Sequence, residues 1–462
     1  SGLMNLLKKT FLFVIVLLAT QLMCSQNAIT SSGGEINSDG GSVVHTFGQV
    51  FYANLIGSNG TTIHEGLLQP YEKKTYTFNN TWSPIDPSGL SFPEDEIVLA
   101  AGDATFSNSN TYFDTLTIDA GASVIIDVGA SITANATNLN STSSAFSSLI
   151  VKGEINGIVN YNRYTALIGS AVGGTNDLIS APVVDQTFGA FATANTNLAA
   201  SNTLRAFAPY NTIAGAYENY DTTTNAATTL VEGIGYRAAT TDGSTLKFTG
   251  TVRTDAVNVS ILYAAAGNGW NLIGNPYPSY IDFVSFFNEN MDQFNSESAY
   301  QAIYGYNGGT SNSWTVFNLA TIADPAITAL IAPGQAFFVK TKATGGVVTF
   351  TTAMQTTGNA DDFILGKQKS KNIALSKLRL SSATKLASTD IYFIEGTTRG
   401  LDLGYDAATY ADSSTDFSIF SNLVADNSAS AMAIQSLDYK DFNDVVVPLG
   451  INAKSAEITI SI

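Results

Sequence analysis

The sequence predicts an all-β protein of several domains, chiefly because of its composition. Of its 462 residues, 13% are charged and 45% are hydrophobic. Low charge together with many Thr, Val, Ile, Phe and Tyr residues suits short strands and tight turns, and few windows show the 3.6-residue periodicity of a helix. A chain of this length can hold three or four domains. We therefore expect a short β-solenoid-like segment followed by tandem β-sandwich modules of a jelly-roll-like kind.

Residues 4–25 are predicted to be a secretory signal peptide. A Lys-Lys pair precedes an apolar run from Phe11 to Ala19, and the small residues Cys24 and Ser25 end the segment. The apolar run is short for a bilayer span, so we expect no membrane span in the mature chain. Cys24 is the one cysteine of the sequence, so a mature chain would have no disulfide and no cysteine-ligated metal.

Two strand-rich regions are expected next. Over residues 26–80 a β-rich N-terminal segment is predicted, with a strand at Ser42–Phe47 after a glycine turn. Over residues 81–165 short apolar runs recur between single glycines, which is typical of the stacked coils of a β-solenoid. Three asparagines can stack on neighbouring coils, namely Asn135, Asn138 and Asn140. β-Solenoids also include polysaccharide lyases and hydrolases, but the acids here lack a nearby basic partner, and we favour a scaffold.

The stretch Gly269–Ser279, GWNLIGNPYPS, is the centre of a predicted repeat. Its buried strand Leu272–Ile273 ends at a Gly-Asn-Pro turn, because proline cannot continue a central ladder. Ser279 or Asp282 can then cap a short helix, whose apolar residues fall on one face at helical spacing. They are Phe283, Phe286, Phe287 and Met291.

An earlier stretch, Leu178–Pro182, repeats the order of strand and proline turn. Downstream of both stretches come an aromatic strand, a glycine turn and a second strand. The matched positions are Tyr236, Gly243 and Phe248 in the first copy and Phe338, Gly345 and Phe350 in the second. Such self-similarity indicates a duplicated unit, which we place at residues 166–256 and 257–358.

This pattern resembles a module of secreted and outer-surface proteins of Bacteroidota that use type IX secretion. The matching residues are Leu178–Val183, Gly233–Tyr236, Phe248–Gly250, Gly269–Ser279 followed by Ile281 and Asp282, and Gly334–Lys340. The resemblance covers most of residues 160–355. It implies a β architecture, contact with the type IX export machinery, and a location that is secreted, extracellular or on the outer-membrane surface. The module has no catalytic residues to carry over.

Residues 359–376 are predicted to be a linker, because hydrophobic content falls and charges alternate there. Residues 377–462 then begin a further β-sandwich, with alternating runs such as Leu378–Leu380 and Thr389–Ile394. The last residues, Ile458–Ile462, alternate without reaching a turn, so we expect this domain to be truncated. In the exported proteins a sorting domain would follow.

The charge balance limits the partners. The net charge of −17 disfavours nucleic acid, whose phosphates require clustered Lys and Arg. We expect no cofactor, although acidic loops can ligate Ca²⁺ through carboxylate oxygens. The calcium candidates are Asp438, Asp441 and Asp444.

The aromatic residues raise the question of a glycan site, because exposed Trp and Tyr rings stack on sugars. The candidates for glycan contact are Trp270, Tyr277 and Trp314. The simpler interpretation is core and turn packing, which aromatic side chains do by default.

The sequence contains no recognisable catalytic arrangement. There is no GxSxG motif, and two histidines leave little room for a catalytic triad. Extracellular surfaces or glycans are the expected partners. We therefore predict a secreted or cell-surface structural or adhesive protein that is not an enzyme. The alternative is a glycan-binding or polysaccharide-active protein, a lyase or a glycosidase, in which any pair of acids could act.

Overall fold

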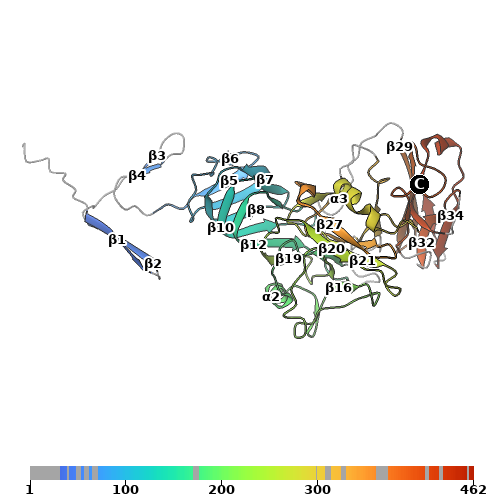
Figure 1. Ribbon diagram of the computed structural model, residues 1–462, viewed down its shortest axis with the longest axis horizontal. Helices are drawn as coiled ribbons and strands as arrows, with labels where there is room; N and C mark the ends of the chain where they lie inside the picture. Colours follow the sequence, from blue (N-terminus) through green and yellow to red (C-terminus); the bar gives the residue numbers. More distant parts are fainter. Residues whose placement is uncertain are drawn as a thin grey trace, which may run out of the picture. The chain divides into compact units, whose positions relative to one another are not determined.

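The computed structural model describes residues 71–169, 176–297, 299–306, 314–323, 329–359, 373–410, 416–425, 430–454 and 457–462, and by backbone alone 32–38, 41–47, 54–56 and 62–64. The described chain is built mainly from strands (Figure 1), which confirms the predicted all-β, multidomain class. Its contacts divide it into two compact units, Ser1–Lys73 and Lys74–Ile462. The predicted signal peptide, residues 4–25, lies outside the described residues.

The described residues of the first unit form two antiparallel strand pairs. One pairs β1 (Ser32–Ser38) with β2 (Gly41–Phe47), and the other pairs β3 (Asn54–Ile56) with β4 (Thr62–His64). The strand predicted at Ser42–Phe47 falls within β2.

The second unit begins with a β-solenoid of about four turns. Its strands are β5 (Thr75–Asn79), β6 (Trp82–Ser83), β7 (Glu96–Phe106), β8 (Thr111–Ile118), β9 (Ala122–Ile126), β10 (Ser131–Asn140), β11 (Ser148–Val151) and β12 (Glu154–Tyr164). Parallel pairing joins β5, β7, β8, β10 and β12 into one wall, and β7, β9 and β11 into another. The predicted start at residue 81 is therefore too late, because β5 already pairs with β7.

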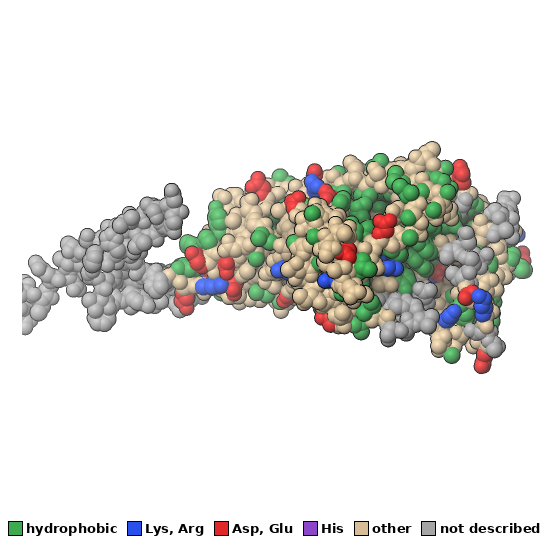
Figure 2. Space-filling model, turned by 90° about the horizontal axis from the view of Figure 1, so that it is seen from below, with side chains coloured by type: hydrophobic (Ala, Val, Ile, Leu, Met, Phe, Trp, Pro, Cys, Tyr) green, Lys and Arg blue, Asp and Glu red, His purple; other side chains and the backbone are tan. Residues whose placement is uncertain are grey.

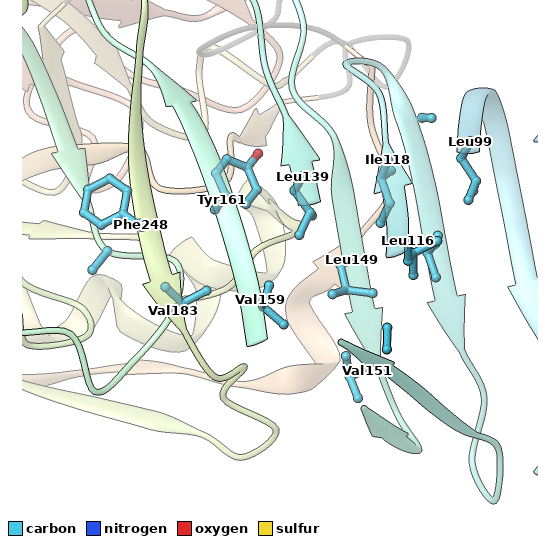
Figure 3. Packing of buried hydrophobic residues seen from close by; sticks show 14 of the residues in the cluster. Leu99, Leu116, Ile118, Leu139, Leu149, Val151, Val159, Tyr161, Val183 and Phe248 are labelled. Carbon is cyan, nitrogen blue, oxygen red and sulfur yellow. The ribbon is translucent and has the colours of Figure 1, made fainter. Parts of the chain in front are cut away.

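A buried ladder of apolar side chains runs across the first wall (Figure 3). Register partners in successive strands are Leu99, Ile118, Leu139, Tyr161 and Phe248. All five are fully buried, and burial of each such side chain contributes about 1.5–3 kcal/mol. The last step leaves the solenoid, because Phe248 belongs to the module that follows.

Amide side chains form a second ladder on the solenoid, as the sequence predicts. Asn140 donates to Asp119 at 3.2 Å and accepts from Asn162 at 2.9 Å. Asn160 donates to Asn138 at 2.9 Å. These bonds join residues 21 or 22 positions apart, which is one coil of the solenoid.

Two similar modules follow. The first contains β13 (Asp177–Ser180), α2 (Phe188–Ala194), β14 (Ala200–Ser201), β15 (Leu204–Arg205), β16 (Phe207–Asn211), β17 (Ala216–Tyr217), β18 (Gly235–Ala238) and β19 (Thr245–Gly250). The second contains β20 (Val257–Ile261), β21 (Trp270–Gly274), β22 (Tyr280–Asp282), α3 (Phe283–Asn290), η1 (Met291–Gln293), β23 (Ile303–Tyr306), β24 (Trp314–Phe317), β25 (Leu330–Ile331), β26 (Ala336–Lys340), β27 (Gly346–Phe350), η2 (Thr352–Met354) and β28 (Gln355–Thr356).

Strand order is the same in both modules, as the sequence repeat predicts. The first sheet has the order β13-β18-β16-β17, and the second has the order β21-β26-β23-β24. Each module also has an outer antiparallel pair, β12 with β19 and β20 with β27. The first copy therefore starts inside β12, near Val159, and not at residue 166. The solenoid and the first copy share this strand.

The register corrects one detail of the predicted alignment. Tyr236 lies opposite Ile179, and in the second copy Phe337 lies opposite Ile273. Tyr236 thus corresponds to Phe337 and not to Phe338. Sequence spacing alone missed this, because one more residue separates the aromatic strand from the last strand in the second copy.

An asparagine at the end of each helix fixes the helix to the last strand of its module. Asn195 donates to the carbonyls of Phe191 and Lys247 and accepts from the amide of Lys247 at 2.6 Å. Asn290 makes the same three bonds with Phe286 and Thr349. α3 begins at the predicted cap, because Asp282 accepts from the Ser285 amide at 2.8 Å.

The two modules contact each other through an approximate two-fold relation. The Ser180 amide donates to the Gly334 carbonyl at 2.8 Å, and the Gly274 amide donates to the Gly233 carbonyl at 2.9 Å. Ser180 corresponds to Gly274, and Gly334 corresponds to Gly233. Reciprocal contacts of this kind are those of an isologous dimer interface, here between two parts of one chain.

The C-terminal domain is built on a seven-stranded sheet of order β34-β32-β33-β30-β29-β35, with β31 beside β33. Its elements are β29 (Ile373–Ser381), β30 (Leu386–Ile394), β31 (Ala407–Ala408), β32 (Phe417–Ser421), β33 (Met432–Leu437), η4 (Tyr439–Asn443), β34 (Leu449–Ala453) and β35 (Thr459–Ser461). The predicted linker 359–376 is too long, because Ile373 already pairs with Ile394. Residues 360–372 lie outside the described part.

Across the described residues, the helices are all too short or too polar to cross a bilayer.

Candidate functional site

Tyr277, a predicted glycan contact, lies in the core of the second module. Its ring is fully buried, and its hydroxyl lies 2.9 Å from the carbonyl oxygens of Asp255 and Phe350. Burial raises the pKa of Tyr277 to about 12. Because the ring has no exposed surface, a sugar cannot stack on it, and the predicted glycan contact of Tyr277 does not fit this structure.

Trp270 is also buried, with 6% of its surface exposed, so its predicted contact with glycan does not fit this structure. It packs edge-to-face against Tyr300 and Tyr304, with ring centroids 5.4 and 4.9 Å away. The Lys340 ammonium lies 5.6 Å from the Trp270 ring centroid and 3.6 Å from that of Tyr300. Cation–π contacts of this kind stabilise a lysine side chain among aromatic rings.

Trp314 is half-buried and stacks on Tyr410, with centroids 3.8 Å apart and planes at 17°. Tyr410 also contacts Trp270 at 4.5 Å, so the structure brings these two predicted residues into one aromatic cluster and leaves Tyr277 out. The cluster joins the second module to the C-terminal domain, and the Tyr304 hydroxyl donates to the Ala408 carbonyl at 2.9 Å. Glycan contact by Trp314 stays a prediction.

The three predicted calcium ligands follow one another around η4. Asp438 caps this helix by accepting from the Lys440 amide at 2.9 Å, and this bond lowers the pKa of its carboxyl. Asp441 pairs with Arg399 at 2.7 Å, which lowers the pKa of Asp441 as well. The Asp444 carbonyl lies 3.5 Å from the Arg399 guanidinium.

Within the described part of the chain, His, Cys, Asp and Glu side chains form no group of three placed to hold a metal ion. The carboxylates of Asp438 and Asp441 are instead occupied by protein hydrogen bonds and an ion pair. Calcium binding at this loop stays a prediction.

Asp406 is the acid most affected by its surroundings. It is almost fully buried, and burial raises its pKa to about 7, with a further contribution from the charge of Asp402. Its two oxygens accept from the amides of Asp402 at 2.7 Å and Ser436 at 2.6 Å. It therefore fixes the loop that leads into β31.

A cavity of about 320 Å³ opens on the sheet of the first module. Its lining is mostly small or amide side chains, with one arginine: Ile168, Gly169, Asn176, Ala206, Asn219, Arg237, Ala238 and Ala239. The Arg237 guanidinium lies 4.2 Å from the Tyr217 ring centroid and donates to Asn219 at 3.4 Å. Burial raises the pKa of Tyr217, and the Arg237 charge opposes that rise.

Sequence reasoning missed this cavity, because its residues come from five segments and share no motif. The available signal was Arg237 itself, a lone cation on a strand of an acidic protein. Figure 2 shows acidic and basic side chains scattered over one face, as expected from the charged share of 13%.

Comparison with protein families gives one match. Residues 74–462 match the model of a domain of unknown function (DUF8693). The chain belongs to this family. The matched span begins where the second compact unit begins, at Lys74, so the family comprises the solenoid, both modules and the C-terminal domain together. No curated protein and no solved structure matches the chain.

Proposed function

We propose that this protein is a secreted or cell-surface structural or adhesive protein without catalytic activity of its own. By its resemblance to type IX cargo, it would leave the cell through that machinery. In this role the second unit presents surface to cells, matrix or glycans.

The observation that carries the proposal is the sharing of β12 between the solenoid and the first module. Residues of β12 from Glu154 to Asn162 pair in parallel with β10, while residues 159–164 pair antiparallel with β19 on the other side. Separating these two domains would therefore break a hydrogen-bonded ladder and open the buried contact of Tyr161 with Phe248. A shared strand of this kind would hold the solenoid and the first module in a fixed orientation, which suits a structural protein.

The other joints are also buried. The Leu149 amide donates to the Pro278 carbonyl at 2.7 Å, which fixes the solenoid to the second module. The buried Arg163 side chain lies 4.2 Å from the Phe146 ring centroid and 3.4 Å from the Gly334 carbonyl. Domains of one chain usually move relative to each other unless their interface is large and hydrophobic, so buried contacts of this kind favour a fixed arrangement.

A glycan-binding role is the second candidate, and Trp314 favours it. Of the three tryptophans, Trp270 is buried, while Trp82 and Trp314 are half-buried. Trp314 therefore keeps an exposed edge beside Tyr306 and Tyr410, and aromatic faces of this kind can contact sugar rings.

Two measurements test the proposal. Full-length protein applied to cells and to arrays of extracellular glycans is expected to bind at least one surface. The same protein incubated with a panel of polysaccharides should release no new reducing ends and no unsaturated products. Release of either product, abolished by substitution of a single Asp or Glu, would show an enzyme and overturn the proposal.

A further inference from the structure

The two modules use the same backbone positions on their outer sheet faces in different ways. By strand register, Arg237 corresponds to Phe338, because they pair with Leu178 and Leu272. Ala208 pairs with Arg237, and Tyr304 pairs with Phe338. Ala208 therefore stands in the first copy where Tyr304 stands in the second.

The two copies can also be matched at the start of the first strand of each sheet, β13 and β21. Asn176 precedes Asp177, which accepts from the Ala166 amide at 2.6 Å. Trp270 precedes Asn271, which accepts from the Leu262 amide at 2.9 Å. Asn176 thus occupies the position of Trp270.

Both positions lie on the face that contains the cavity in the first copy. In the second copy this face is filled by large side chains, Trp270 and Tyr304, and is covered by Tyr410 of the C-terminal domain. In the first copy Asn176 takes the place of Trp270 and lines a space of about 320 Å³, while Ala208, at the position of Tyr304, is buried. The cavity therefore goes with the smaller side chain at position 176, on strands that both copies share.

Arg237 gives the cavity its chemistry. It is the one charged side chain among the lining residues, all of which belong to the described chain. Stacking on Tyr217 at 4.2 Å and the bond to Asn219 fix its plane, so that an arginine fork is held ready for a carboxylate. The net charge of the chain is −17, which repels an anion at long range. Within the cavity, the nearby Arg237 guanidinium would attract the carboxylate of an acidic ligand.

We propose that this cavity of the first module is a binding site for an acidic sugar, with Arg237 holding the carboxylate of a uronic acid unit. The volume lies at the lower end of the roughly 300–1,000 Å³ of small-molecule sites, so one sugar unit fits. Amide side chains both donate and accept, which suits hydroxyl groups, and two amides line the cavity beside Arg237. This proposal goes beyond the scaffold role, because it names a class of ligand, acidic sugars, and the cavity that binds it.

Calorimetric titration of the full-length chain tests this site. The probes are trisaccharides of galacturonate, glucuronate and mannuronate, with galactotriose as the neutral control and trialanine as a peptide carboxylate. At least one acidic trisaccharide is expected to bind at least tenfold more tightly than galactotriose and trialanine. If none does, or if trialanine binds as tightly, the proposal is wrong.

Variants locate the binding. Arg237→Gln should weaken it at least tenfold, and Arg237→Lys should weaken it less, because the charge remains while the fork is lost. Asn176→Trp refills the cavity with the residue of the second copy and should abolish binding. The matched Lys247→Gln variant, which removes an exposed cation of the first module outside the cavity lining, should bind normally. Unchanged affinity in both Arg237→Gln and Asn176→Trp, with normal circular dichroism, would overturn the site. The non-catalytic role is tested separately, because only the release of new reducing ends from a polysaccharide would contradict it. Loss of the cavity proposal alone would leave that assay unchanged.

Discussion

The first and second modules have the same strand order and the same helix anchor, yet their outer faces differ. The second face is packed with aromatic rings and covered by the C-terminal domain. The first retains small residues, an arginine and a cavity. The framework set by the strands and by Asn195 and Asn290 thus tolerates very different side chains on its outer sheet. The same strand framework therefore supports a contact with the C-terminal domain in one copy and a cavity beside Arg237 in the other.

The largest expected difference between the copies is at Trp270 and Asn176. Trp270→Ala should lower the free energy of unfolding by about 4 kcal/mol, because it removes a large buried ring and leaves a cavity. Asn176→Ala, at the corresponding position, should change it by less than about 0.5 kcal/mol. Urea denaturation followed by circular dichroism measures both. Similar losses in the two variants would contradict the asymmetry of the faces.

Asp406 lies in the C-terminal domain, which packs on the second copy, and it should make the stability of that domain depend on pH. Its folded pKa of about 7 lies above the value near 3.9 of an unfolded chain. Between these values the folded state binds more protons, so the free energy of unfolding falls as pH rises from about 4 to about 7 and is then constant. The expected fall is on the order of 4 kcal/mol. Urea denaturation at several pH values should show this dependence, and Asp406→Asn should reduce it. If the free energy of unfolding depends on pH in the same way in Asp406→Asn, a group other than Asp406 causes the dependence.

The helix anchors should behave alike in both copies. Asn195→Ala and Asn290→Ala each leave one buried amide and two carbonyls without their partner, at a cost of about 2 kcal/mol. Differential scanning calorimetry of the two variants should show comparable losses. Asn197→Ala, at a partly exposed turn near Asn195, is a control expected to cost less. A large loss of thermal stability in only one of these two variants would show that the asparagines are not equivalent in the two copies.

Tyr277 provides the smallest expected effect. Val183 follows Pro182 in the first copy as Tyr277 follows Pro276 in the second, so the hydroxyl bonds of Tyr277 are specific to the second copy. Tyr277→Phe should cost about 1 kcal/mol, because the ring is kept and one buried hydroxyl is lost. The same denaturation assay measures it. A stabilised variant would mean that this hydroxyl is poorly satisfied in solution.

Local signals in the sequence predicted much of the fold. The Gly-Asn-Pro turn, the Asp282 cap and the spacing of Phe283, Phe286 and Phe287 gave the helix α3. α2 was missed because its sequence, FGAFATA, offers only two large apolar residues and small neighbours. Of the predicted site residues, Trp270 and Tyr277 proved to be buried, since an aromatic residue after a turn carries no sign of which side it faces.

The sequence by itself determined the strand-rich class, the asparagine ladder of the solenoid and the repeat, because each depends on residues close together or at a fixed period. Only the tertiary structure decided that β12 serves two domains, that the modules meet reciprocally, and that one sheet face is covered while the other holds a cavity. Those outcomes depend on which distant surfaces fit each other, and shape complementarity between segments a hundred residues apart leaves no periodic pattern in the chain.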